Sequence, residues 1–378
     1  MYMDSFELGP IRPPSEAFSL LLRLTRNCPW NRCKFCHIYK GSKFELRSVD
    51  ELKQEILTAR RIRDSIDEIA RQPGNGRVVQ DIAAALASNP PSEGYRNVAL
   101  WLYGGGETVF LQDANTLIMR TPDLLEVLLF LKNTLPGIKR ITSYARSKTA
   151  AKKTVEELKQ LHKAGLSRLH IGLESGYDPL LELMDKGVTA AEHIKGGKNV
   201  VASGISLSEY VLLGLGGDKM WREHALETAR VLSEIDPDFI RVRTLTINNQ
   251  MPLYDEIQAG NFIRATDETI VAEERLLIEN LDCHSNFVSD HITNLLQEID
   301  GKLPQDKERM LEIIDRFQAL SPEEQTNFKV GRRAGIYNGL DDLADTKRHE
   351  IADRMVNRIR QGSEPLDDIL YAMMERFI

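Results

Sequence analysis

Three cysteines within nine residues are the group in this sequence best suited to chemistry, and they directly follow an apolar, strand-like run at residues 19–25. They are Cys28, Cys33 and Cys36. Thiolates at this spacing can converge from one loop onto a soft metal centre, most often a four-iron cluster or zinc. The remaining cysteine, Cys283, is distant in sequence. The simplest interpretation is an iron-sulfur cluster with one iron left open to bind a co-substrate.

The segment from Cys28 to Cys36 resembles the cluster-binding loop of the radical S-adenosylmethionine (radical SAM) superfamily. That loop most often reads Cys-x3-Cys-x2-Cys with an aromatic residue before the last cysteine; Phe35 takes this position, and the first spacing here is one residue longer. In that family S-adenosylmethionine (SAM) chelates the open iron of a [4Fe-4S] cluster, and one electron cleaves it to a 5'-deoxyadenosyl radical. The resemblance implies a [4Fe-4S] cluster on the three cysteines, with SAM as a second cofactor.

Two alternatives to such an enzyme stay open. His37 directly follows the last cysteine and could complete a structural zinc site. The same cysteines could also belong to a non-enzymatic iron-sulfur or zinc protein that senses redox state or metal. Added SAM separates these hypotheses, because only the enzyme yields 5'-deoxyadenosine under reducing, oxygen-free conditions.

The composition is ordinary for a globular protein, with 42% hydrophobic and 28% charged residues. A net charge of −7 disfavours a nucleic-acid partner, which usually requires a basic surface. The sequence has no apolar run of the roughly 18 residues needed for a membrane span and no export signal at its start. Clustered cysteines suit a reducing compartment. We therefore expect a cytoplasmic protein.

Strand-like apolar runs alternate with helical stretches through the first two thirds of the chain. The runs lie at residues 19–25, 98–103, 140–145, 168–173, 207–213 and 239–245. Such alternation predicts an α/β fold with a parallel sheet and right-handed crossovers, and leaves a doubly wound sheet possible. The resemblance implies the partial (β/α)6 barrel of radical SAM enzymes, which is open.

The predicted domain organisation is a barrel core over residues 1–262, with a helical insertion at about 70–94, and a helical C-terminal extension over 263–378. Helices are expected at 265–280 and 307–320, with another beginning after Ser321. The segment 282–291 between the first two is rich in polar residues that could line a pocket. Cys283 in this segment could donate a hydrogen atom or bind metal, although an isolated cysteine is more often simply buried.

Chemistry in α/β folds lies at the carboxyl ends of the strands, so residues after each run are the site candidates. Gly104-Gly105-Gly106-Glu107 follows the run at 98–103. It could be a simple tight turn, but it resembles the Gly-Gly-Glu motif that receives the ammonium group of SAM. The resemblance assigns Gly105, Gly106 and Glu107 to cofactor binding.

Further candidates follow the later strands. Glu174 could accept both ribose hydroxyls of SAM, or it could compensate charge at a helix start. By resemblance, Lys186 or Arg146 pairs with the SAM carboxylate. Glu209 and Tyr210 on the run at 207–213 are competing candidates for the ribose.

Arg241 and Arg243 alternate on the last run and share one face. They would either bind an anionic group of a substrate or form a solvated stripe. The resemblance implies an enzyme that abstracts hydrogen from a small-molecule substrate, with its cluster reduced by a flavodoxin or ferredoxin. Neither the catalytic residues nor the substrate follow from the sequence.

Overall fold

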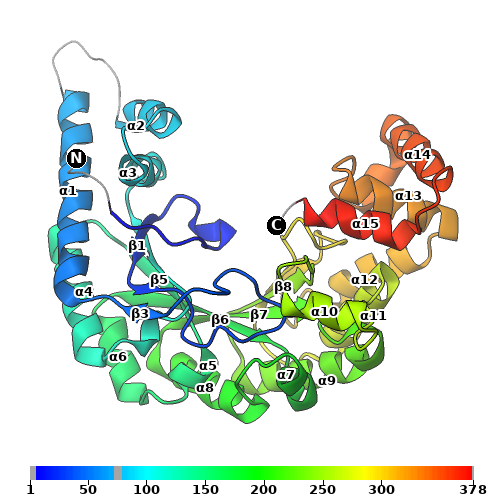
Figure 1. Ribbon diagram of the computed structural model, residues 1–378, viewed down its shortest axis with the longest axis horizontal. Helices are drawn as coiled ribbons and strands as arrows, with labels where there is room; N and C mark the ends of the chain where they lie inside the picture. Colours follow the sequence, from blue (N-terminus) through cyan, green and yellow to red (C-terminus); the bar gives the residue numbers. More distant parts are fainter. Residues whose placement is uncertain (1–5, 72–78, 377–378) are drawn as a thin grey trace. The chain divides into compact units, whose positions relative to one another are not determined.

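The computed structural model describes residues 6–71 and 79–376. Its main feature is a sheet of eight strands in the order β1-β4-β5-β6-β7-β8-β9-β10 (Figure 1). The strands are β1 Leu20–Arg23, β4 Thr108–Gln112, β5 Arg140–Ala145, β6 Leu166–Glu174, β7 Ser206–Leu213, β8 Phe239–Thr244, β9 Asn286–Val288 and β10 Asp300–Lys302. Two short strands, β2 Thr25–Arg26 and β3 Glu45–Leu46, form a separate antiparallel pair.

The strand order decides between the two α/β architectures that the sequence leaves possible. The pairs β1–β4, β4–β5, β5–β6, β7–β8 and β8–β9 are parallel, and the pair β9–β10 is antiparallel. Successive strands are neighbours in chain order, whereas a doubly wound sheet reverses its order at a switch point. Among the described strands, β1 and β10 are the two ends of the sheet, so it is open. The predicted α/β class with a mostly parallel sheet is confirmed.

Most of the helices lie where the periodicity of apolar residues predicts a helix. They are α1 Val49–Arg71, α2 Val79–Ser88, α3 Glu93–Tyr103, α4 Thr121–Thr134, α5 Ser147–Ala150, α6 Val155–Lys163, α7 Asp178–Leu183, α8 Ala190–Ser203, α9 Gly217–Ile235, α10 Pro252–Gln258, α11 Asp267–Asn280, α12 Lys307–Gln318, α13 Pro322–Arg333, α14 Thr346–Arg360 and α15 Leu366–Glu375. Among the residues that the structure describes, none of these helices combines the length and apolar character needed to span a bilayer.

The chain divides into two compact units. The first comprises Met1–Asn31, Ile38–Ile171 and Lys195–Leu207, and the second comprises Arg32–His37, Gly172–Ile194 and Ser208–Ile378. Each unit thus combines segments that are separated in the sequence, and the second unit includes residues from both sides of position 262. The predicted boundary between residues 262 and 263 therefore stays a prediction.

Helix α1 shows why residues of the first unit fold as they do. It buries an apolar face with helical spacing, formed by Leu52, Ile56, Ala59, Ile62 and Ile66. Helix α6 begins with the capping box predicted from its sequence, because Thr154 and Glu157 each accept a hydrogen bond from the other's backbone N–H. These local signals fix the starts and the buried faces of the helices around the sheet.

The strand predicted at residues 98–103 is wrong. These residues form helix α3, which is capped by Ser92 accepting a hydrogen bond from the Tyr95 N–H at 3.2 Å. The side chain of Asn97 on α3 bonds both the N–H and the C=O of Leu21 in β1, at 3.1 and 2.9 Å. A short apolar run is compatible with a buried helix as well as with a strand, and these residues form a helix. The second strand of the sheet is instead β4, which follows α3. Of the helical insertion predicted at about residues 70–94, residues 72–78 lie outside the described part of the chain.

The second unit contains the helices expected near 265–280, 307–320 and after Ser321, which are α11, α12 and α13. Figure 1 shows α13, α14 and α15 side by side at the red end of the chain, where Val330, Val356 and Leu370 pack together. The polar segment 282–291 contributes a strand that periodicity does not predict. This strand, β9, pairs with β8.

Candidate functional site

The cysteine loop begins in a tightly turned backbone. Asn27 and Asn31 have positive φ values of 67° and 50°, a conformation that asparagine tolerates better than most residues. The Asn31 N–H donates a hydrogen bond to the Cys28 sulfur at 3.4 Å. Cys28, Cys33 and Cys36 form no disulfide and are partly exposed, whereas Cys283 is buried.

Lys34 fixes the segment that carries the second and third cysteines. Its N–H donates to the Met184 carbonyl at 3.0 Å, and its own carbonyl accepts from the Leu253 N–H at 3.0 Å. Its ammonium group forms an ion pair with Glu256 at 2.6 Å. The backbone between Cys33 and Cys36 is therefore held from both sides.

The donor set of this loop fits an iron-sulfur cluster. Cysteine sulfurs are the usual ligands of such a cluster, and a backbone N–H donated to sulfur stabilises a thiolate. Among the described residues, no three His, Cys, Asp or Glu side chains are placed together to hold a metal ion, and this includes Cys28, Cys33 and Cys36. The chemical type of these donors, and not their placement, is therefore what suits a cluster. Cys283 has a raised pKa, because burial disfavours its thiolate.

Asp113, directly after β4, is a site residue that the sequence analysis does not identify. Its buried carboxylate pairs with Arg23 at 2.9 Å and accepts the Asn27 N–H at 3.1 Å. It also accepts a hydrogen bond from the Tyr39 hydroxyl, whose pKa is raised by burial and by this carboxylate. Because Asn27 precedes the cysteine loop and Tyr39 follows it, Asp113 joins the two sides of the loop. An acidic residue two positions after the apolar run 109–111 is the available sequence signal.

The placement predicted for Gly105, Gly106 and Glu107 is wrong, because these residues precede β4 rather than follow it. Glu107 forms an exposed ion pair with Lys139, at 2.6 Å, and Lys139 precedes β5. Both therefore lie at the amino ends of parallel strands. The carboxyl ends lie at the other edge of the sheet, so these three residues are not carried forward as cofactor ligands.

Arg146, which competes with Lys186 as the predicted partner of the SAM carboxylate, follows β5 and lies beside the cysteine loop. Its guanidinium carbon is 5.2 Å from the ring centre of Trp30, a loop residue. Its backbone N–H donates to the Asn115 side chain at 3.1 Å. Within the first unit, Arg146 and Trp30 thus form a cation–aromatic contact at the loop.

Three predicted cofactor residues of the second unit come together around Lys186. Its ammonium nitrogen lies 3.0 Å from the Glu174 carboxylate and 5.6 Å from the ring centre of Phe35. Glu174 ends β6 with a positive φ of 64°. Gly172 leaves the room for this pair, because a Cβ there would lie 2.1 Å from Glu174 Oε1 and 3.2 Å from Lys186 Nζ. The structure does not assign either side chain to a ligand.

Glu209 and Tyr210 on β7 are the two candidates for the ribose of SAM. Of these, Glu209 interacts electrostatically with Lys186 and Glu174. Its carboxyl oxygens are buried and have no hydrogen-bond partner among the described residues. Burial raises the pKa of Glu209 well above its ordinary value; Lys186 opposes the rise and Glu174 adds to it. Burial also raises the pKa of Tyr210, but the charges acting on Tyr210 are those of Arg243, Arg241 and Asp290. A carboxyl group held neutral can donate a hydrogen bond.

His224 connects the ends of two strands in the second unit. Its Nδ1 lies 2.9 Å from the Ser175 hydroxyl, and its Nε2 lies 3.2 Å from the Leu212 carbonyl. Nε2 is also 3.3 Å from Glu273, which accepts the Gly214 N–H at 3.1 Å. Burial lowers the pKa of His224 to about 4. This buried network positions the residues that follow β6 and β7.

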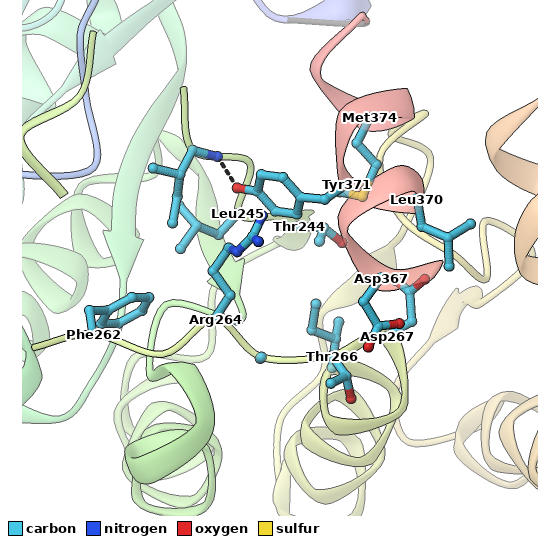
Figure 2. A pocket seen from close by; sticks show the side chains of 14 residues that line it. Thr244, Leu245, Phe262, Arg264, Thr266, Asp267, Asp367, Leu370, Tyr371 and Met374 are labelled. Carbon is cyan, nitrogen blue, oxygen red and sulfur yellow. Dashed lines mark hydrogen bonds between the residues drawn. The ribbon is translucent and has the colours of Figure 1, made fainter. Parts of the chain in front are cut away.

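A small cavity with a volume of about 40 Å³ lies at the carboxyl ends of β7 and β8 within the second unit (Figure 2). Helix α15 covers part of it: the Tyr371 hydroxyl accepts a hydrogen bond from the Ile247 N–H. Arg264 lies 4.1 Å from the Tyr371 ring centre and pairs with Asp368 at 2.6 Å. The lining is Gly214, Thr244, Leu245, Ile247, Phe262, Arg264, Ala265, Thr266, Asp267, Ile270, Asp367, Leu370, Tyr371 and Met374.

No family model matches this sequence. Among curated proteins, the uncharacterized protein MJ0486 of Methanocaldococcus jannaschii is 28% identical over 100 residues, which are 26% of this chain and 30% of that protein. The chain thus spans less than a third of the length of this relative.

The solved structures similar to this chain include Elp3 of Methanocaldococcus infernus, with 14% identity, a TM-score of 0.44 and coverage of 63% of this chain and 61% of the other. OxsB, a cobalamin-dependent S-adenosylmethionine radical enzyme, has 14% identity, a TM-score of 0.47 and coverage of 95% and 58%. Methylornithine synthase PylB has 16% identity, a TM-score of 0.40 and coverage of 79% and 81%. The residues of this chain, rather than these likenesses, carry the functional conclusion.

Proposed function

We propose that this protein is a radical SAM enzyme that abstracts hydrogen from a small-molecule substrate. The observation that carries the proposal is the loop with three cysteines in nine residues, whose Phe35 lies beside Lys186 and its partner Glu174. Cys28, Cys33 and Cys36 would hold a [4Fe-4S] cluster. When bound, this cluster supplies an open iron that chelates SAM and one electron for its reductive cleavage.

The side chains around Lys186 account for the binding of SAM. Lys186 would exchange Glu174 for the carboxylate of SAM, with which it can form a charge-assisted hydrogen bond. The released Glu174 carboxylate could then accept the two ribose hydroxyls. Arg146 is the second candidate for the carboxylate. Glu209, kept neutral by burial, can donate a hydrogen bond to the same ligand.

The remaining parts of the proposal are the reductant and the substrate. The cluster would receive its electron from a flavodoxin or ferredoxin, and the exposed fraction of the three thiols is consistent with a cluster near the surface. The cavity beside β7 and β8 is a candidate for the substrate's apolar part, since Leu245, Phe262 and Leu370 line it.

The test is anaerobic reconstitution with iron and sulfide, followed by metal analysis and Mössbauer spectroscopy. We expect one four-iron cluster per chain, and 5'-deoxyadenosine and methionine on addition of SAM and dithionite. Cys36→Ala should lose both the cluster and SAM cleavage, whereas Cys283→Ala is the matched control and should keep both.

Two results would contradict the proposal. Stoichiometric zinc without iron, in protein purified anaerobically from its own cells, would support the structural zinc site. A cluster that forms fully but never cleaves SAM would support the sensor alternative.

A further inference from the structure

Arg241 and Arg243 on β8 form a pair of buried cations in the second unit. They are in register with Tyr210 and Leu212 of the parallel neighbour β7, so all four side chains lie on one face of the sheet. The Arg241 and Arg243 side chains are only 10% and 14% exposed. Leu212 packs against the hydrophobic cluster that also contacts Phe35 of the cysteine loop.

Among the described residues, Asp290 is the carboxylate that pairs with these two guanidinium groups. Asp290 Oδ2 lies 3.3 Å from Arg241, and its Oδ1 lies 3.1 Å from Arg243. Its own side chain is 51% exposed, so each arginine has a single, half-solvated contact to it. Neighbouring His291 does not alter this balance, because burial and the Arg243 charge lower its pKa to about 4 and keep it neutral at pH 7.

The pair also has unused hydrogen-bond donors. Arg241 Nε and Arg243 Nη2 are buried and have no hydrogen-bond partner among the described residues. Burying a cation and its donors without an anion is costly, and two guanidinium groups against one carboxylate leave one positive charge uncompensated. Guanidinium groups bind carboxylates and phosphates through two parallel hydrogen bonds, for which such donors are suited.

We propose that Arg241 and Arg243 form an anion subsite that binds the carboxylate or phosphate group of the substrate, with Asp290 holding the subsite until the substrate displaces it. That the bound anion belongs to a substrate rests on the proposed function. That the site binds an anion at all rests on the charges of the second unit. Tyr210 forms one wall of the subsite, because the Arg243 guanidinium carbon lies 5.2 Å from its ring centre. Its position beside Arg243 assigns Tyr210 to the substrate rather than to the ribose of SAM.

The test is calorimetric titration of the full-length, cluster-loaded protein with inorganic phosphate and, separately, with acetate, at constant ionic strength. We expect millimolar or tighter binding of at least one anion, and the two titrations distinguish a phosphate from a carboxylate site. Arg241→Gln and Arg243→Gln should each weaken binding at least tenfold. Asp290→Asn should strengthen it several-fold, because it removes the competing carboxylate.

Arg230→Gln is the matched control, since Arg230 is an exposed arginine that also contacts two side-chain carboxylates, Glu227 and Glu234. It should leave anion binding unchanged. Equal affinity in the wild type and Arg243→Gln would overturn the subsite. A weaker anion affinity in Asp290→Asn would overturn it as well, by showing that Asp290 is only a structural partner.

The two proposals fail separately. Anion binding is measured without SAM cleavage, so a chain that carries zinc instead of iron still reports on the subsite. Conversely, 5'-deoxyadenosine formation with no effect of these substitutions on anion binding would overturn the subsite and leave the proposed function standing.

Discussion

Lys186 and Glu174, expected from the sequence to hold different groups of one ligand, form an ion pair with each other at 3.0 Å. The pair is mostly buried, with 11% and 18% of the two side chains exposed. A ligand that takes Lys186 must therefore compete with Glu174, and the carboxylate it releases becomes available to the same ligand.

Glu174→Gln should weaken SAM binding roughly tenfold or more and leave the iron content unchanged. The substitution keeps the size of the side chain but loses charge-assisted hydrogen bonds worth about 1.5–3 kcal/mol each. Titration of anaerobic, cluster-loaded protein with SAM measures the effect. Glu107→Gln is the matched control and should bind SAM normally, because Glu107 lies at the amino end of β4. Normal binding by Glu174→Gln would leave Glu174 a purely structural residue.

Gly172→Ala should also disturb the ion pair between Lys186 and Glu174. The added Cβ would lie 2.1 Å from the Glu174 carboxylate, too close to be accommodated without moving it. We expect SAM affinity to fall about as far as in Glu174→Gln, since the same side chain is displaced. Gly362→Ala, where the nearest atom is 3.2 Å away, is the control. If Gly172→Ala binds SAM like the wild type, the position of Glu174 does not determine affinity.

Asp113→Asn should destabilise the fold and reduce cluster occupancy. The carboxylate is fully buried and paired with Arg23, and breaking a buried ion pair from one side costs about 3 kcal/mol. Denaturant unfolding and iron analysis measure the two effects. Asp123→Asn, which removes an exposed pair with Arg120, should cost about 0.5 kcal/mol or less and keep the cluster. A stable Asp113→Asn variant with a full cluster would show that the loop does not depend on this contact.

The sequence predicts most elements of this fold because their signals are local. The capping box of α6 and the buried stripe of α1 need only neighbouring residues. The run at 98–103 is too short to separate strand from helix, and the Ser92 cap is the cue that decides it. Because the glycines were assigned to the end of that run, their placement at the sheet edge was wrong as well.

The site is less predictable because its contacts come from distant segments. Asp113 joins Arg23, Asn27 and Tyr39, and no periodicity links these positions. The choice between Glu209 and Tyr210 depends on which face of β7 each occupies. A strand alternates its faces, so this choice requires the position of the strand in the sheet rather than residue type.

Stability should depend on pH through Glu274, which is fully buried. Burial raises its pKa from 4.5 to about 8, so the folded state retains a proton that the unfolded state loses. The contribution is fully present below pH 4.5 and is lost as the pH rises towards 8, by about 1.4 kcal/mol per pH unit.

Denaturant unfolding between pH 5 and 8 should therefore show a shallower pH dependence for Glu274→Gln than for the wild type. Glu279→Gln, on the same helix but with a 38% exposed side chain, is the control and should keep the wild-type dependence. Parallel curves for the wild type and Glu274→Gln would mean that Glu274 is ionised in the folded protein.

The docking of α15 on the cavity has a consequence for the order in which the chain folds during synthesis. Leu370, Tyr371 and Met374 line the cavity together with residues 214 and 244–270, which leave the ribosome much earlier. Domains generally form from the amino-terminal side first, so the emerging chain presents the ends of β7 and β8 without this cover. During that interval the Ile247 N–H lacks its Tyr371 partner, and the apolar side chains of Leu245 and Phe262 lack the cover of α15.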